Sequence, residues 1–173
     1  MNPAPPARGD KSRLFLALWP DEAARRAVAA WQARWSWPAG AAVVPAERLH
    51  LTLHFIGPVA RERLPEITPA LARPCPRFEI AFGAAECWPR GLALLMPASV
   101  PPALLELHER LAQALSALDL PVEARPFRPH LTLARKAAGA LPPPEPAVLP
   151  WPVAGYALVV SDRGYRTLAR YGA

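Results

Sequence analysis

Short apolar runs separated by turn residues predict an antiparallel arrangement of strands along most of the chain. The run 13–19 is almost wholly apolar and favours a buried strand. The run 49–56 is expected to be a strand that ends at Gly57-Pro58, because that dipeptide interrupts regular pairing. The remaining strands are expected at 78–87, 92–96, 129–135, 156–160 and 165–169, with hairpin turns across 89–91 and 162–164.

Three other segments carry helical periodicity. Pro20-Asp21 open the first of these helices, which is expected to run for about four turns. Its apolar stripe consists of Ala24, Val28, Trp31 and Trp35. The segment 60–73 is interrupted by prolines and predicts a short or kinked helix, whereas 103–118 repeats leucine at helical spacing and predicts the clearest helix. Five prolines in 137–150 favour a loop there.

The predicted element order repeats itself, since each half of the chain reads strand, helix, then strand. This order predicts an α+β fold with two lobes related by a pseudo-two-fold axis, each a sheet covered by an outer helix, around a central cleft. We expect one such bilobal domain over 13–173. Residues 1–12 are polar and proline-rich, and we expect them to form a flexible tail.

Composition narrows the class of protein. An apolar content of 52% excludes a disordered chain, and no apolar run reaches the roughly 18 residues of a membrane helix. The beginning of the sequence lacks the apolar core of a secretory signal, and Cys75 and Cys87 are expected to be reduced thiols. These features favour a cytoplasmic protein with no membrane partner and no obligate protein partner. The net charge of +6 mildly favours a polyanionic partner.

A repeated tetrapeptide carries the chemistry: His-Leu-Thr-Leu occurs at 50–53 and again at 130–133. Half of the four histidines and half of the four threonines of the chain lie in these two copies. Strand alternation sets the His and the Thr of each copy on one face, with the leucines on the other. Packing alone does not require a matched polar pair twice, so the repeat indicates two halves of one active site.

Two histidines on opposing strands form an acid and base pair, because a side-chain pKa near 6.5 allows both protonation states. Such a pair suits phosphodiester cleavage, in which a nucleophile loses a proton and a leaving oxygen gains one. Thr52 and Thr132 are expected to hydrogen-bond the phosphate oxygens. Arg135 would complete the pocket, although strict alternation sets it opposite His130, so the strand must twist, bulge or end there. This chemistry requires neither a metal nor a cofactor.

The other histidines and the aromatic residues are weaker candidates. His54 shares the predicted strand face of His50, but no acidic or cysteine cluster supports a metal pair there, and it is left outside the site. His108 is expected to be a solvated position of its helix. Phe55 and Phe127 lie near the motifs and are candidates for base stacking. Trp19, Trp31 and Trp35 are expected in the core.

On the basis of these two motifs, the chain resembles the 2H phosphoesterase superfamily, which is named for two His-x-Thr/Ser-x motifs. Within it, the chain is similar to the RNA 2′,3′-cyclic phosphodiesterases, also called 2′-5′ RNA ligases. The opening apolar strand with Trp-Pro, the phrase at 49–57 and the phrase at 125–135 carry the resemblance, which covers nearly all of 13–171. It implies a bilobal α+β fold with both motifs in the cleft.

The resemblance also implies an activity and residue roles: metal-independent hydrolysis of an RNA 2′,3′-cyclic phosphate to a 2′-phosphomonoester, with 2′-5′ ligation as a related reaction. It makes His50 the proton donor and His130 the proton acceptor, with Thr52, Thr132 and Arg135 holding the phosphate. The partner would be RNA with a cyclic phosphate end or a 2′-5′ linkage. Two alternatives stay open: a 2H enzyme acting on small cyclic nucleotide or ADP-ribose phosphates or on 2′-5′ oligonucleotides, and a non-catalytic RNA-binding module.

Overall fold

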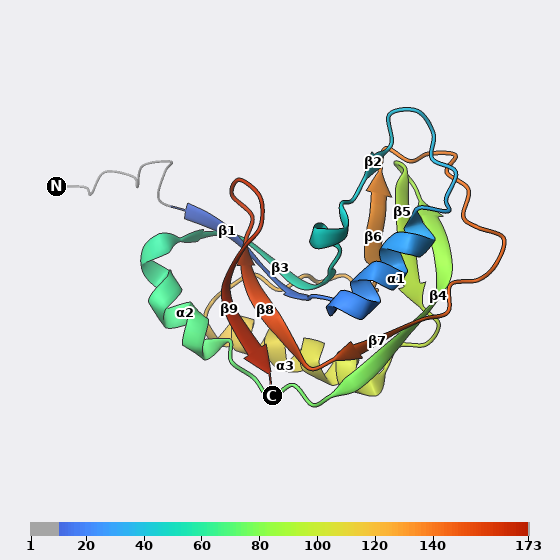
Figure 1. Cartoon of the computed structure of the whole chain (residues 1–173). Helices are drawn as coiled ribbons and strands as arrows, with labels where there is room; N and C mark the ends of the chain where they lie inside the picture. The colour runs from blue at the N-terminus through green and yellow to red at the C-terminus, as the bar shows by residue number, and fades with distance from the viewer. Residues whose placement is uncertain (1–10, 173) are drawn as a thin grey trace.

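The fold is one curled, nine-stranded antiparallel sheet with helices packed on its outer side (Figure 1). The computed structural model describes residues 11–172. The strands are β1 (Lys11–Leu18), β2 (Ala42–Val43), β3 (Leu51–Ala60), β4 (Phe78–Trp88), β5 (Leu92–Pro97), β6 (Leu131–Arg135), β7 (Leu149–Val153), β8 (Gly155–Val160) and β9 (Arg166–Gly172). The helices are α1 (Glu22–Gln32), α2 (Leu64–Ala70) and α3 (Pro102–Ala117), with 3₁₀ turns η1 (Ala46–Arg48) and η2 (Arg61–Arg63).

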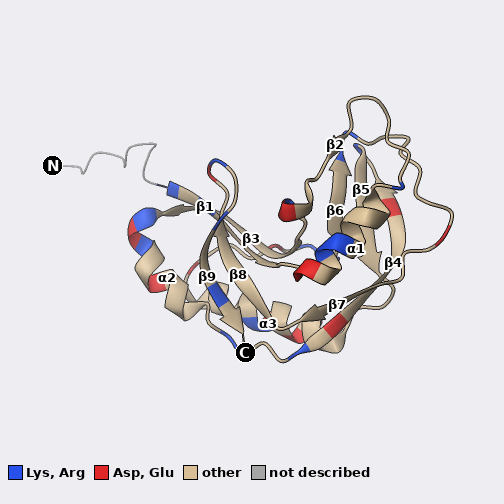
Figure 2. Cartoon of the chain, viewed as in Figure 1, with Lys and Arg blue, Asp and Glu red and all other residues tan. Residues whose placement is uncertain are grey.

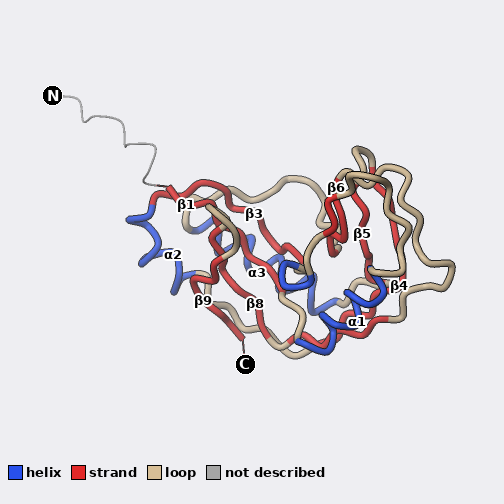
Figure 3. The backbone as a smooth tube through the Cα atoms, turned by 45° about the horizontal axis from the view of Figure 1, so that its top comes forward, coloured by secondary structure: helices blue, strands red, loops and turns tan. Residues whose placement is uncertain are grey.

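The strand order β7-β4-β5-β6-β3-β1-β8-β9 divides the sheet into two four-stranded halves, with β2 added beside β6. The halves meet where β3 and β6 form a single residue pair, Leu51 with Leu131. These halves are the two lobes on either side of the centre in Figures 1 and 3. The predicted bilobal α+β architecture is confirmed, with the difference that the two sheets are continuous through this pair.

Each lobe has a helix against its outer face. α1 packs on the lobe of β4 to β7, and α3 packs against β3 in the other lobe (Figures 1 and 3). The predicted stripe of α1 is buried, and the Asp21 carboxylate caps its first turn by accepting a hydrogen bond from the Ala24 N–H at 2.8 Å. The leucines of α3 that face the sheet are fully buried: Leu104, Leu107, Leu111 and Leu115.

Several predicted boundaries were wrong. α1 ends at Gln32 after about three turns, because Trp35 enters the core from the turn that follows the helix. β3 passes through Gly57-Pro58 to Ala60, because a register shift beside Gly57 lets its positive φ of 85° fit within the paired strand. Lys11 and Ser12 belong to β1 and not to the expected tail, whose first ten residues lie outside the described part of the chain.

The proline-rich segment predicted as a loop ends in a strand, β7, that contains Pro150 and Pro152. Both prolines are exposed, while Trp151 and Val153 between and after them are buried. β7 pairs only with β4 and forms one edge of the sheet, so a residue without an N–H donor is tolerated on its outer side. The two-residue strand β2 also had no signal in the sequence.

Among the described residues, no helix is long and apolar enough to cross a membrane. The expectation for the cysteines is confirmed, since Cys75 and Cys87 are both free thiols.

The first motif strand contains a β-bulge at the second leucine of the repeat. On the neighbouring strand β1, Ala17 pairs with Thr52. Leu16, the residue before Ala17 on β1, pairs with His54. This register leaves Leu53 without a partner on β1. An extra residue reverses the alternation of side chains, so Thr52 and His54 point to opposite faces of the sheet.

The second motif strand contains the same bulge at the same motif position. On β5, Leu94 pairs with Thr132, whereas its neighbour Ala93 pairs with Ala134. Leu133 is therefore the extra residue, and both Leu133 and Ala134 are buried. The two copies of the repeat share their local backbone irregularity as well as their sequence.

A buried amide holds the bulge of β6. The Gln32 side chain, at the end of α1, is 5% exposed and donates from Nε2 to the carbonyl oxygens of Leu133 (2.8 Å) and Val44 (2.9 Å). The Leu133 carbonyl also accepts the Val44 N–H at 2.8 Å. Gln32 thus supplies a second donor to the Leu133 carbonyl and ties the bulge to the carbonyl of Val44.

Replacing Gln32 by Met keeps the side-chain volume but removes both hydrogen bonds, so the half-buried Val44 carbonyl loses its side-chain donor. We expect the free energy of unfolding to fall by about 1–3 kcal/mol. Chemical denaturation followed by circular dichroism measures it. The matched control is Gln113→Met, because exposed Gln113 bonds only Glu109 on the surface of α3 and should change stability by under about 0.5 kcal/mol. Equal stability of the Gln32→Met variant and the wild type would contradict the assigned role.

Candidate active site

A pocket of about 330 Å³ lies where the two lobes meet. Its lining includes five residues predicted from the sequence, namely His50, Thr52, His130, Thr132 and Arg135. The rest of the lining comes from β2 with the turn that follows it (42–45), from Arg48 and from Tyr165. The structure therefore brings both copies of the repeat and the predicted arginine to one place.

Both motif histidines are oriented in the same way. Nδ1 of His50 lies 2.6 Å from the carbonyl oxygen of Arg48, and Nδ1 of His130 lies 2.7 Å from that of Arg128. A carbonyl oxygen only accepts, so Nδ1 carries the proton in each ring and donates it. Nε2 of each ring makes no hydrogen bond within residues 11–172, which leaves it free to exchange a proton with a substrate.

The Leu51–Leu131 pair fixes how the two motifs face each other. In an antiparallel pair, the residues that flank it set the His of each motif opposite the Thr of the other. Both leucines are fully buried, so the flanking polar side chains share the opposite, pocket face. Diagonal neighbours across such a pair are about 7–8 Å apart, a separation at which two imidazoles can flank one phosphate.

Arg135 reaches the pocket because of the bulge at Leu133. Without the bulge, alternation would turn Arg135 away from Thr132. The extra residue restores it to the face of Thr132, and Arg135 lines the pocket as an exposed cation. The sequence required the strand to twist, bulge or end before Arg135 could join the site. The bulge at Leu133, which Gln32 supports, meets that requirement.

Aromatic rings surround His50. Trp19 stacks on its imidazole with ring centroids 4.8 Å apart, and Tyr165 meets it edge-on at 5.2 Å. Phe15 closes the group at 5.2 Å. Trp19 was expected in the core and Tyr165 was not predicted at all. The only indication for Tyr165 in the sequence is its position directly after the turn of the last predicted hairpin. In the structure its side chain is 45% exposed.

A different group surrounds His130. The Trp88 ring lies 5.2 Å from the imidazole, and its indole N–H donates to the Glu86 carboxylate at 2.5 Å. The Arg128 guanidinium lies 4.4 Å above the Trp88 ring and pairs with Glu86 at 3.3 Å. Arg128 therefore acts twice near His130. Its side chain contacts Trp88 and Glu86, and its carbonyl oxygen orients the His130 imidazole.

The rings of His54, His108 and Phe127 form one stack on the outer face of the sheet. The expectations that His54 shares the strand face of His50 and that His108 is solvated were wrong. The bulge at Leu53 turns His54 to the outer face, where Nε2 lies 2.8 Å from the His108 carbonyl. His108 is stacked between His54 and Phe127, with centroids 4.0 Å apart on each side, and is not a solvated position. Burial lowers the pKa of His108 to about 4, with a further contribution from His54. Phe127 stacks on His108 and is not among the residues that line the pocket, so base stacking by Phe127 stays a prediction.

Phe55 lies on the pocket side of β3. It is 49% exposed, and the Arg13 guanidinium lies 5.5 Å from its ring centroid. It stands just beyond the residues that line the pocket, so a stacking role for Phe55 stays a prediction. Within residues 11–172, no three His, Cys, Asp or Glu side chains are grouped as metal ligands.

Comparison with known proteins identifies the family. The family model described as the 2′-5′ RNA ligase superfamily matches residues 19–164. The chain belongs to this superfamily.

Relatives in the superfamily are similar over most of their length. The RNA 2′,3′-cyclic phosphodiesterase of Thermus thermophilus is 35% identical over 166 residues, covering 87% of this chain and 82% of the relative. The protein of the same name from Escherichia coli is 31% identical over 139 residues, covering 78% and 79%. The crystal structure of E. coli LigT in apo form superposes with a TM-score of 0.83 at 28% identity, covering 94% and 98%. The predicted family, and with it the prediction of an enzyme, is confirmed.

In this member of the 2′-5′ RNA ligase superfamily, the surroundings of the pocket lower the pKa of His50. Burial is the main cause of the lowered pKa of His50, and the hydrogen bond to the Arg48 carbonyl opposes it. The positive charge of Arg135 lowers the pKa further, as does His130. The imidazole is therefore mostly neutral in the free protein at pH 7.

The pKa of His130 is lowered by the same main cause, burial. The hydrogen bond to the Arg128 carbonyl raises it, whereas the charges of Arg128 and Arg135 lower it. The carboxylate of Glu86 raises it in turn, and no carboxylate acts on His50 in that way. The two histidines of the repeat therefore differ in their electrostatic surroundings.

The imidazole titrations of His50 and His130 should both have midpoints below 6.5 in the free protein, followed by NMR of the ring Cε1–H signals. Arg135→Gln removes a cation that disfavours protonation of both rings, so both midpoints should rise. Arg135→Lys keeps the charge and is the matched control, with midpoints close to those of the wild type. If both midpoints stay unchanged in Arg135→Gln, the Arg135 guanidinium does not face the two rings.

Proposed function

We propose that this chain is an RNA 2′,3′-cyclic phosphodiesterase, which opens the terminal cyclic phosphate of an RNA strand to a 2′-phosphomonoester. The observation that carries the proposal is the arrangement of two His/Thr pairs and Arg135 around one pocket of about 330 Å³. The relatives from T. thermophilus and E. coli bear the name of this activity. Structures of E. coli LigT complexed with phosphate and with 3′-AMP, similar at TM-scores of 0.79 and 0.83, add support.

In the proposed reaction, water attacks the phosphorus while Nε2 of His130 accepts its proton. The bond between phosphorus and the 3′ oxygen breaks, and Nε2 of His50 donates a proton to that oxygen. The products are a 2′-phosphate and a free 3′ hydroxyl, with His130 protonated and His50 neutral until solvent restores both. Acid and base catalysis of this kind contributes about 10²–10⁴-fold for each well-placed group.

The polar groups between the histidines stabilise the charge that shifts onto the phosphate oxygens. The hydroxyls of Thr52 and Thr132 donate hydrogen bonds from opposite sides of the pocket. The Arg135 guanidinium offers two parallel N–H donors to the same group. All of these groups belong to the chain, so the reaction as proposed uses no metal ion and no nucleotide cofactor.

Binding of the phosphate prepares the acid. The anion offsets the positive charge of Arg135, which in the free protein lowers the pKa of both histidines. The pKa of His50 therefore rises on binding, and the ring takes up the proton that it later donates. Glu86 favours the protonated form of His130 and so stabilises the cation that forms there as water is deprotonated.

The same pocket supports 2′-5′ ligation when the 5′ hydroxyl of a second RNA replaces water as the nucleophile. In the reverse cleavage of a 2′-5′ linkage, the two histidines exchange roles. A cytoplasmic location remains a prediction from the sequence.

An oligoribonucleotide that ends in a 2′,3′-cyclic phosphate should be converted to the 2′-phosphate in the presence of EDTA, followed by ³¹P NMR. We expect His50→Ala and His130→Ala each to lower kcat by about 10²–10⁴-fold. His108→Gln is the matched histidine control, since His108 lies in the stack on the outer face, and its kcat should stay within about threefold. RNA binding without turnover in the wild type would favour the non-catalytic alternative and refute the proposal.

A substrate with sulfur in place of the 3′ oxygen separates the acid from the base, because a thiolate, with a pKa near 8.5, leaves without prior protonation. With this substrate we expect most of the loss in His50→Ala to disappear, whereas His130→Ala should remain as impaired as on the oxygen substrate. Single-turnover rates of the two variants on the two substrates provide the measurement. The opposite pattern, rescue of His130→Ala alone, would exchange the two roles.

A further inference from the structure

A second hollow, of about 740 Å³, lies beside the catalytic pocket. It is formed by the hairpin that joins β8 to β9, together with residues of η1 and η2. Arg48 and Tyr165 line both the hollow and the catalytic pocket, so the two are continuous. We call it the hairpin hollow.

The lining of the hairpin hollow is basic. Its charged residues are Arg48, Arg61, Arg163 and Arg166 against Glu47 and Asp162. The Asp162 carboxylate is already occupied, since it accepts the backbone N–H of Arg13 at 2.9 Å and pairs with Arg61 at 3.4 Å. Arg163 and Arg166 are exposed and form no ion pair with any residue in the range 11–172.

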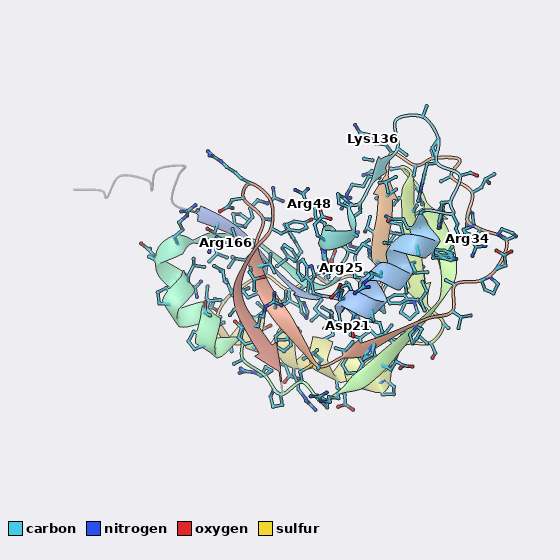
Figure 4. All side chains as sticks on the ribbon, in the orientation of Figure 1. Asp21, Arg25, Arg34, Arg48, Lys136 and Arg166 are labelled. Atoms are coloured by element: carbon cyan, nitrogen blue, oxygen red, sulfur yellow. The ribbon has the colours of Figure 1, made fainter. Side chains whose placement is uncertain are left out.

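The figures locate this charge on the β8–β9 hairpin and near η1. Figure 2 shows Lys and Arg at the tip of the β8–β9 hairpin, and Figure 4 shows Arg166 on that hairpin with Arg48 on the side toward β6. Unpaired arginines on one wall and Arg48 on the other form a cationic path that begins at the catalytic pocket.

We propose that the hairpin hollow binds the RNA strand beyond its terminal nucleotide, and that the enzyme therefore prefers oligoribonucleotides to free nucleoside cyclic phosphates. This inference rests on the proposed function and adds the subsite that recognises the strand beyond its last nucleotide. The catalytic pocket holds the cyclic phosphate, and the adjacent phosphodiester lies against Arg163 and Arg166.

The chemistry of the lining matches a single RNA strand. Guanidinium groups bind phosphate through paired N–H donors, and exposed aromatic rings accept bases by stacking. Tyr165 supplies such a ring at the junction of the two hollows, with Arg48 at 5.8 Å from its centroid. A free nucleoside cyclic phosphate lacks the second phosphate, so it gains nothing from the two hairpin arginines.

A competing exit exists on the far side of Trp19. This hollow, of about 440 Å³, carries Arg77 and Arg170 against Asp21. It shares no lining residue with the catalytic pocket and has half as many arginines as the hairpin hollow. Continuity and charge therefore both favour the hairpin hollow as the path of the strand.

The test compares kcat/KM on adenosine 2′,3′-cyclic phosphate with kcat/KM on a five-nucleotide RNA ending in the same group. The double variant Arg163→Gln/Arg166→Gln should lower kcat/KM on the RNA by about tenfold and leave the mononucleotide unchanged. The dependence of log kcat/KM on log salt for RNA should become shallower by about 0.7 for each phosphate that the variant no longer neutralises. Arg77→Gln/Arg170→Gln is the matched control and should behave as the wild type on both substrates.

Mononucleotide activity is the internal check that each variant folds. A wild type that hydrolyses both substrates equally well would overturn the inference and leave the proposed function standing. The same holds if Arg77→Gln/Arg170→Gln loses the RNA preference and Arg163→Gln/Arg166→Gln keeps it. Equal losses in both double variants would point to the general charge of the molecule and also overturn it. A wild type inactive on both substrates would refute the proposed function itself.

Discussion

The single pair of Leu51 and Leu131 is the constraint on which the rest of the site depends. Both side chains are fully buried, so their neighbours on either side are turned to the opposite face. A slip of one residue by either strand would turn the histidine and threonine of that strand's motif into the core. The apolar packing of two leucines therefore holds four polar groups in register across two lobes.

Much of this arrangement could be predicted from the sequence, because the repeated His-Leu-Thr-Leu is a local pattern with a definite periodicity. The shared face of each His/Thr pair followed from alternation, and the repeat indicated that His50, Thr52, His130 and Thr132 meet in one pocket. The bulges at Leu53 and Leu133 could not be predicted, since they arise from pairing with β1 and β5, far away in the sequence. They explain why Arg135 enters the pocket and why His54 leaves it.

Other differences also come from tertiary contacts. Phe127 lies near the second motif in the sequence, but its ring packs on His108 of α3 and is not among the residues that line the pocket. β7 forms in spite of its prolines because an edge strand needs hydrogen bonds on one side only. Tyr165 becomes part of the pocket only when the β8–β9 hairpin folds back beside η1.

The two halves of the pocket are alike in backbone and unlike in charge. Phe55 and Arg135 occupy equivalent positions, each five residues after its motif histidine and just beyond a bulge. One half thus places an apolar ring beside the pocket, whereas the other places a cation in its lining. Together with Glu86 near His130, this difference makes the two histidines chemically distinct within a nearly symmetric frame.

The strand order has a consequence for how the molecule is made. The lobe that carries His50 combines β1 and β3 from the beginning of the chain with β8 and β9 from its end, and Leu14 pairs with Val160. During synthesis this lobe cannot close until nearly the whole chain has emerged, whereas most of the strands of the other lobe are contiguous. Such long-range pairing slows folding, so the pocket between the lobes is completed last, although one of its walls is synthesised first.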